Sequence, residues 1–254
     1  MVHHHHNTDR AGARPGAQGD GVFGSTGRQT VVPVSVAILA GGAASRMGVP
    51  KGLLPVANGP LISRIIDRVG KLTDDVLCVT CEPEVYAWEA QRVRFVADYN
   101  GEPRSPLSGI LGALSAARYE VCIVVGVDMP FLNPALLQYL ASLAQPFPPA
   151  PAADVVLPTI CGDRPECVHA VYRKSCLPAA TAALEEGRVK VTSFFRDVQV
   201  TRVPAERLRR IDPLLSSFVN VNTPREHARI LTPGAAAGHA TRRNRSCPVE
   251  APRS

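Results

Sequence analysis

From Val34 onward, short apolar runs alternate with stretches of helical periodicity, and this pattern limits the fold more than any other feature of the sequence. Runs rich in β-branched residues predict strands at Val34–Leu39, Val76–Thr80, Val93–Ala97 and Val121–Val127. The last run is apolar almost throughout, which is typical of a central strand buried on both faces. The alternation predicts an α/β fold with a mainly parallel, Rossmann-like, doubly wound sheet and helices on both faces.

Helices are expected between these runs. From Pro60 to Leu72, and again from Pro106 to Arg118, large aliphatic residues recur at the spacing of one helix face. Pro60 suits the first position of its helix, and Asn133-Pro134 supplies the cap and first position of another. A proline-rich stretch at 146–151 then precedes shorter strands and helices around 154–203.

Both ends of the chain have the composition of disordered tails. Residues 1–30 and 234–254 are rich in Gly, Ala, Arg and polar residues without periodicity, so the folded domain is expected at 31–233. That domain should close with a strand at Phe218–Val221 and a helix capped at Thr223-Pro224. Most of the formal net charge of +6 falls in the two tails. A nucleic-acid-binding protein would concentrate its charge on a folded face, so nucleic acid is not expected as a partner.

The sequence predicts a cytoplasmic protein. No apolar run approaches the roughly 20 residues that span a membrane, and no secretion signal is recognisable. The seven cysteines are an odd number in a chain too long to need disulfide stapling, so free thiols are expected. Cys78 and Cys81 form the one C-x-x-C pair. Without a second pair they are more typical of strand-end cysteines than of a metal or redox site.

A loop of small residues follows the first expected strand. The segment Leu39–Lys51 reads L-A-G-G-A-A-S-R-M-G-V-P-K. Small residues at Ala40-Gly41-Gly42 let backbone N–H groups approach a polyphosphate closely. Arg46 and Lys51 add cationic charge that can hold phosphates and stabilise a leaving pyrophosphate. The loop matches neither a dinucleotide fingerprint nor a Walker loop. The alternative is an ordinary glycine-rich turn with solvated cations.

Polar side chains follow later strands, at the carboxyl edge where open α/β sheets bind ligands. Asp128 ends the run at 121–127, where a carboxylate can ligate Mg2+ beside substrate phosphates or cap the next turn. Asp98 ends the preceding strand and can contact nucleotide or metal, or begin a turn. Asn220 and Asn222 lie two apart on an extended stretch and so share a face. They could bind metal or acceptor, or serve as turn and cap residues.

Taken together, these segments resemble the molybdenum cofactor guanylyltransferase family. The resemblance rests on the loop, on D-M-P at 128–130, on S-P-L-S-G-I-L-G-A-L at 105–114 and on F-V-N-V-N-T-P at 218–224. These motifs stand in the family's order across the expected domain. The loop alone marks only the wider nucleotidyltransferase superfamily, and the last motif narrows it. The second glycine of L-A-G-G favours the guanylyl branch over the related cytidylyltransferases.

The resemblance implies a fold of the nucleotide-diphospho-sugar transferase type and a specific reaction. GTP and Mg2+ would bind the loop, the phosphate of molybdenum-bearing molybdopterin would attack the α-phosphorus, and pyrophosphate would leave. The family uses no covalent enzyme intermediate, which suits a chain without a recognisable Ser-His or Cys-His grouping. The resemblance implies backbone contacts to the nucleotide from Leu39, Ala40 and Gly41, phosphate binding by Lys51, a nucleotide contact from Asp98, Mg2+ ligation by Asp128, and acceptor-phosphate contacts from Asn220 and Asn222.

Two departures from the family pattern bear on the substrate. Val79-Thr80-Cys81-Glu82 stands where the family commonly has an asparagine that helps read guanine, and the segment between Asp98 and Pro106 is longer than expected. One alternative is therefore a cytidylyltransferase for the same pterin or another small-molecule NTP transferase. A second is a non-catalytic nucleotide-binding protein, against which Lys51 and Asp128 argue. Transient contacts with other molybdenum cofactor biosynthesis proteins are expected from the same resemblance.

Overall fold

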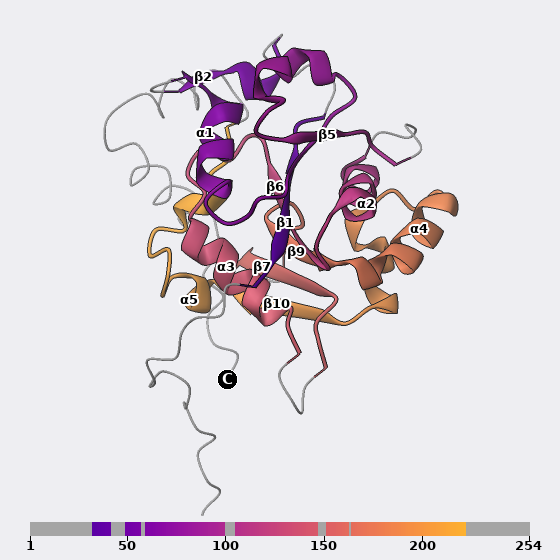
Figure 1. The fold of residues 1–254 in the computed structure, drawn as a ribbon. Coiled ribbons are helices and arrows are strands. Elements are labelled where there is room, and N and C mark those ends of the chain that lie inside the picture. The colour runs from indigo at the N-terminus through magenta and orange to yellow at the C-terminus, as the bar shows by residue number, and fades with distance from the viewer. Residues whose placement is uncertain are drawn as a thin grey trace, which may run out of the picture. The chain divides into compact units, whose positions relative to one another are not determined.

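The computed structural model describes residues 32–41, 49–56, 59–99, 105–146, 151–162 and 164–221 (Figure 1). They form one mixed, mostly parallel sheet and a separate two-stranded pair. The strands of the sheet are β1 (Val34–Leu39), β4 (Val76–Val79), β5 (Arg94–Val96), β6 (Val121–Gly126), β7 (Val155–Cys161), β8 (Arg164–Pro165), β9 (Ala170–Arg173) and β10 (Val200–Pro204). The separate pair is β2 (Pro55–Val56) and β3 (Gly59–Pro60). The expected fold class is confirmed.

The strand order is β10-β7-β9-β6-β1-β4-β5, with β8 paired to β7. The neighbours β6, β1, β4 and β5 are all parallel, whereas β9 runs antiparallel to both β6 and β7. In register, Leu39 of β1 faces Gly126 of β6, and Val124 of β6 faces Ala170 of β9. Because β9 runs in the opposite direction, the residues just before it lie at the edge where β1 and β6 end.

Helices cover both faces of the sheet (Figure 1). They are α1 (Leu61–Val69), α2 (Pro106–Ala116), α3 (Pro134–Leu143), α4 (Leu177–Glu185) and α5 (Ala205–Leu208), with 3-10 helices η1 (Lys51–Leu53), η2 (Pro83–Glu89), η3 (Lys174–Cys176), η4 (Val191–Asp197) and η5 (Ser216–Phe218). Helices α1, α3 and α5 pack on one face, and α2 and α4 pack on the other. Each helical layer forms a hydrophobic core with the sheet, and strand β1 contributes to both cores. Its Val36 and Ile38 side chains pack in the core with α1, α3 and α5, and its Ala37 side chain packs in the core with α2 and α4.

The expected helix starts are largely confirmed. The Asn133 side chain accepts a hydrogen bond from the Ala135 backbone N–H and caps α3. Ser105 caps α2 through a reciprocal pair of hydrogen bonds with Ser108. Pro60 differs from expectation, since it has an extended backbone and occupies the cap of α1 rather than its first helical position. Strand β1 has the expected bounds, and the other three strands are shorter by a residue at one or both ends.

The strand expected at Phe218–Val221 is wrong. Ser216–Phe218 form η5, because the carboxylate of buried Asp212 accepts hydrogen bonds from the backbone N–H groups of Ser216 and Ser217. The chain is extended at Val219, but it joins no sheet, and the Val221 N–H donates instead to the backbone oxygen of Asp128. The helix expected from Thr223-Pro224 and both tails lie outside the described residues, so the domain bounds stay predictions.

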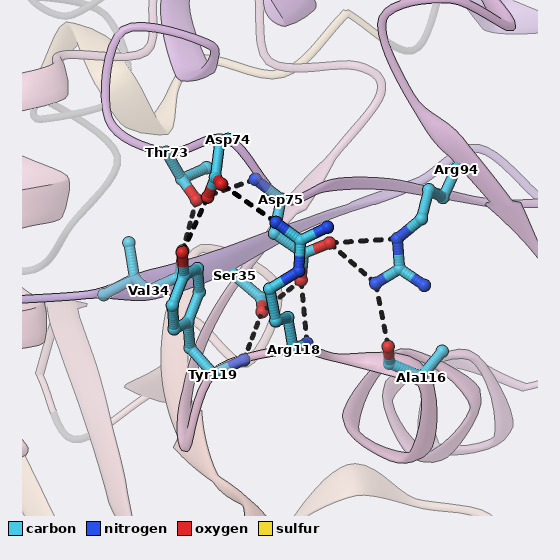
Figure 2. Close-up of polar contacts among 9 residues, drawn as sticks. All are labelled: Val34, Ser35, Thr73, Asp74, Asp75, Arg94, Ala116, Arg118 and Tyr119. Carbon is cyan, nitrogen blue, oxygen red and sulfur yellow. Dashed lines mark hydrogen bonds and ion pairs between the residues drawn. The ribbon is translucent and has the colours of Figure 1, made fainter.

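The amino edge of the parallel strands is held together by one buried carboxylate (Figure 2). Asp75, which is 1% exposed, accepts hydrogen bonds from the Ser35 hydroxyl at 2.5 Å and the Arg118 backbone N–H at 2.8 Å. It also accepts two from the Arg94 guanidinium, at 3.0 and 2.6 Å. Burial raises the pKa of Asp75, but the hydrogen bonds from Ser35, Arg118 and Arg94 outweigh it, and the pKa is lowered. Asp75 thus links β1, β4, β5 and the turn before β6.

Most of the described cysteines are free, as expected: Cys78, Cys81, Cys122, Cys167 and Cys176. Cys161 takes part in a disulfide, so the expectation of free thiols is wrong for that residue. Burial raises the pKa of the Cys78 thiol to about 12, which makes it unreactive at neutral pH. No group of three or more His, Cys, Asp or Glu side chains within the described ranges could hold a metal ion.

Candidate active site

Two of the residues expected to do chemistry meet at the carboxyl edge of the sheet. Lys51 opens η1 and Asp128 follows β6, 77 residues later in the chain. The Lys51 Nζ atom lies 3.0 Å from Oδ2 of Asp128, and their side chains are 27% and 18% exposed. A pair that is only partly covered remains accessible to a ligand, so either group can exchange its partner for a phosphate or a cation.

The last residue of β6 leaves room for the Asp128 carboxylate. A methyl group on Gly126 would lie only 2.6 Å from Oδ1 of Asp128, and 3.4 Å from Cγ1 of Val168. Real Cβ atoms essentially never approach an oxygen so closely, so any larger residue at 126 must displace the carboxylate. Glycine is required here by close approach, and its position fixes where Asp128 can point.

Gly126→Ala should therefore impair turnover without unfolding the protein. The atom to be displaced is the end of a short side chain, which can rotate, but its new position misplaces the carboxylate. We expect a fall in kcat of at least about tenfold, since roughly 1 Å of misplacement can cost 100-fold. Steady-state pyrophosphate release would measure kcat, and a thermal melt would show that the variant remains folded. Gly70→Ala, at the end of α1, is a matched control that should leave turnover unchanged.

The backbone after Asp128 is held by helix α1. The Arg64 Nε atom donates to the Pro130 backbone oxygen at 3.1 Å, and Arg68 Nη1 donates to the Leu132 backbone oxygen at 2.6 Å. On the other side, the Val221 N–H donates to the Asp128 backbone oxygen at 2.9 Å. Neither arginine could be expected at the site from the sequence, because a polar residue on an amphipathic helix ordinarily faces solvent.

The position of Lys51 is also limited by a packing contact of the residue that follows it. A methyl group on Gly52 would lie 2.8 Å from ring atoms of Tyr86, so η1 lies directly against that buried ring. Tyr86 belongs to η2, in the connection between β4 and β5. Tyr86 therefore limits where η1, and with it Lys51, can lie. Nothing in the sequence around Tyr86 distinguishes it from an ordinary core aromatic.

The residues expected to bind the nucleotide also come together. A methyl group on Gly41 would lie 3.5 Å from Oδ2 of Asp98, an ordinary van der Waals distance. Asp98 accepts hydrogen bonds from the Cys81 thiol at 3.2 Å and from the Ser108 hydroxyl at 3.3 Å. The Ala40 N–H donates to the Val79 backbone oxygen at 2.9 Å, which ties the start of the loop to β4. Cys81 thus contacts a residue expected to bind the nucleotide, and within the described ranges it belongs to no group of three or more side chains that could hold a metal ion.

The expected acceptor side is partly visible. Asn220 precedes Val221, whose N–H donates to the backbone oxygen of Asp128, so this segment lies against the backbone of the residue that carries the candidate catalytic carboxylate. The side-chain oxygen of Asn220 is buried and has no hydrogen-bond partner among the described residues. Gly42, Arg46 and Asn222 lie outside the described residues, and their expected roles stay predictions.

The chain is similar in sequence to nucleotidyltransferases. Residues 36–203 match the model of the MobA-like NTP transferase domain. A probable molybdenum cofactor guanylyltransferase of Pelotomaculum thermopropionicum is 33% identical over 203 residues, covering 79% of this chain and 94% of that protein. A molybdenum cofactor guanylyltransferase of Desulfosudis oleivorans is 31% identical over 192 residues, covering 74% and 90%.

Similarity to solved structures agrees with these sequence matches. The crystal structure of molybdopterin-guanine dinucleotide biosynthesis protein A from Archaeoglobus fulgidus superimposes with a TM-score of 0.65 and 26% identity. The alignment covers 77% of this chain and 96% of that one. Separately, none of the helices among the described residues is long and apolar enough to cross a membrane.

Proposed function

The chain belongs to the MobA-like NTP transferase family, among the molybdenum cofactor guanylyltransferases, and on that premise we propose that it transfers GMP from GTP to molybdopterin. The acceptor is the phosphate of molybdenum-bearing molybdopterin, and the products are the guanine dinucleotide cofactor and pyrophosphate. The observation that carries the proposal is the contact of Lys51 with Asp128 at the carboxyl edge of the sheet. A cation for phosphate and an oxygen ligand for a metal are the two groups that in-line nucleotidyl transfer requires.

The donor set fits Mg2+. This ion keeps several waters and is usually held by one or two carboxylates plus substrate phosphates, so a single accessible carboxylate such as Asp128 suffices. When bound, Mg2+ would neutralise phosphate charge and polarise the α-phosphorus. The Lys51–Asp128 ion pair would then be the arrangement without substrate, in which each group neutralises the charge of the other. Nucleotide binding would release Lys51 to the phosphates and Asp128 to the metal.

The remaining expected residues divide between the two substrates. Backbone N–H groups of the loop from Leu39 to Gly42 would cradle the triphosphate, with Arg46 and Lys51 stabilising the leaving pyrophosphate. Asp98, close to Gly41, would contact the nucleotide. Asn220 and Asn222 would bind the acceptor phosphate, a role supported by the position of Asn220 beside the Asp128 backbone contact. The proposed setting is the cytoplasm, with transient contacts to other cofactor-biosynthesis proteins and none to nucleic acid or membrane.

Nucleotide preference tests the proposal most directly. Calorimetric titration of the purified protein with GTP, CTP and ATP, each with Mg2+, should show GTP binding at least about tenfold more tightly, a difference of about 1.4 kcal/mol. Lys51→Ala should weaken GTP binding by a comparable factor, because one charge-assisted contact is lost.

Each outcome of the titration has a definite reading. Preference for CTP would assign the cytosine dinucleotide as product and would be explained by Thr80-Cys81 in place of the family's asparagine. Failure to bind any nucleotide would overturn the proposed function. Preference for GTP would be followed by conversion of molybdopterin to the guanine dinucleotide, measured by chromatography.

A further inference from the structure

His169 lowers the stability of the folded protein in its present position. Its side chain is fully buried, and neither ring nitrogen has a hydrogen-bond partner in the part of the chain that the structure describes. Burial lowers the pKa of His169 to about 3, against an opposing effect of Asp212, so the ring is neutral at physiological pH. Its backbone φ is 120°, in the region that favours glycine. Unsatisfied polar groups and backbone outliers persist where the surroundings impose them, and such sites are often functional.

The place of His169 in the fold suggests what imposes it. Residue 169 immediately precedes β9, the antiparallel strand, and therefore lies at the edge where β6 ends. Its N–H donates to the Val124 backbone oxygen at 3.0 Å. Its neighbour Val168 closes the space around Gly126, the same space that Asp128 Oδ1 occupies. His169 is therefore buried at the end of β6, next to the residue that packs near Asp128.

The imidazole also contacts the acceptor segment. Its ring centroid lies 4.4 Å from that of Phe218, with the planes tilted by 43°. Phe218 is the last residue of η5, and the chain after it is extended at Val219, carries Asn220 and then binds the Asp128 backbone through Val221. The segment 218–221 thus has a contact at each end, the Phe218 ring with His169 and the Val221 N–H with the Asp128 backbone oxygen. Asn220 lies between them.

The imidazole of His169 and the side-chain oxygen of Asn220, which lies two residues after Phe218, are chemically complementary. A neutral imidazole carries one N–H donor, and the buried side-chain oxygen of Asn220 is an acceptor without a donor. We propose that His169 is a positioning residue for the acceptor: it holds the 218–221 segment through Phe218 and hydrogen-bonds the Asn220 side-chain oxygen when the acceptor draws that segment into place. The inference rests on the proposed function, since it takes molybdopterin as the ligand of Asn220.

Substitution at 169 separates this role from a structural one. His169→Phe keeps an aromatic ring against Phe218 and removes both unsatisfied nitrogens, so the protein should melt at an equal or higher temperature. Nevertheless the KM for molybdopterin should rise about tenfold, as expected for one lost buried hydrogen bond, with the KM for GTP unchanged. His169→Gln, which keeps an N–H donor, should retain more acceptor affinity than His169→Phe. In combination with Asn220→Ala, the loss should be less than additive.

A second measurement uses the wild-type protein. With 15N-labelled histidine, the imidazole resonances of His169, assigned by their absence in His169→Gln, should shift when molybdopterin is added and stay in place when GTP is added alone. Resonances unmoved by molybdopterin, or a wild-type KM for molybdopterin in His169→Phe, would overturn the inference while leaving the proposed function intact. A wild-type protein that forms no product from GTP and molybdopterin would overturn both.

Discussion

Asp128→Asn should abolish turnover, with a loss of at least about 100-fold in kcat, and should leave the melting temperature nearly unchanged. The substitution keeps the shape of the side chain but removes the charge that lies 3.0 Å from the Lys51 Nζ atom and that we propose holds Mg2+. Because that ion pair is partly exposed, its loss changes folding stability little. Pyrophosphate release and calorimetric melting measure the two effects separately.

Asp197→Asn is a suitable control for this experiment. It removes a carboxylate from another partly exposed ion pair, with Arg196 at 3.5 Å, on η4 and outside the candidate site. Both variants should melt like the wild type, and only Asp128→Asn should lose activity. If Asp128→Asn kept more than a tenth of wild-type turnover, Asp128 could not be the metal ligand. A coincident loss of stability would instead assign it a structural role.

Asp75→Ala should destabilise the fold by about 3 kcal/mol. The substitution removes the acceptor of four hydrogen bonds and leaves the Ser35 hydroxyl and the Arg118 backbone N–H without their partner (Figure 2). Each buried donor left unsatisfied costs on the order of 1–3 kcal/mol. The Arg94 side chain is 46% exposed and can be solvated again, so it adds less. Denaturant unfolding at neutral pH gives the value.

The neighbouring Asp74 supplies the control, and acidity supplies a second test. Asp74 pairs with Arg118 and Tyr119 at the surface, so Asp74→Ala should destabilise far less. The pKa of Asp75 is lower in the folded protein than in the unfolded chain, so its contribution is complete at neutral pH and declines below pH about 4. The stability gap between wild type and Asp75→Ala should therefore narrow in acid. A gap independent of pH would contradict the role of the carboxylate.

The sequence predicted the strands that local residue patterns determine and the residues that the parallel sheet brings to one edge. β-branched runs located β1 and β6 because their periodicity is local. Lys51 and Asp128 were expected together because both follow parallel strands, whose carboxyl ends share one edge. In contrast, Phe218–Val221 has the composition of a strand but forms η5 and an extended stretch. That outcome depends on the Asp212 carboxylate and the Asp128 backbone, two partners that no local pattern reveals.

His169 and Gly126 could not be found from sequence for a different reason. Both are informative only once β9 is known to run antiparallel beside β6, since this direction brings Val168 and His169 to the end of β6. A short apolar strand has no signature of its direction. Tyr86 and the two arginines of α1 are likewise ordinary residues until their partners Gly52, Pro130 and Leu132 are placed against them.

The hydrogen bond from Val221 to Asp128 also sets an order of events during protein synthesis. The nucleotide loop, β6 and Asp128 leave the ribosome long before residue 221, and chains tend to fold from the N-terminus as they emerge. The backbone contact that fixes the Asp128 turn therefore becomes available only near the end of translation. Since a domain folds as a unit, the candidate site is complete only after nearly the whole described chain has been synthesised.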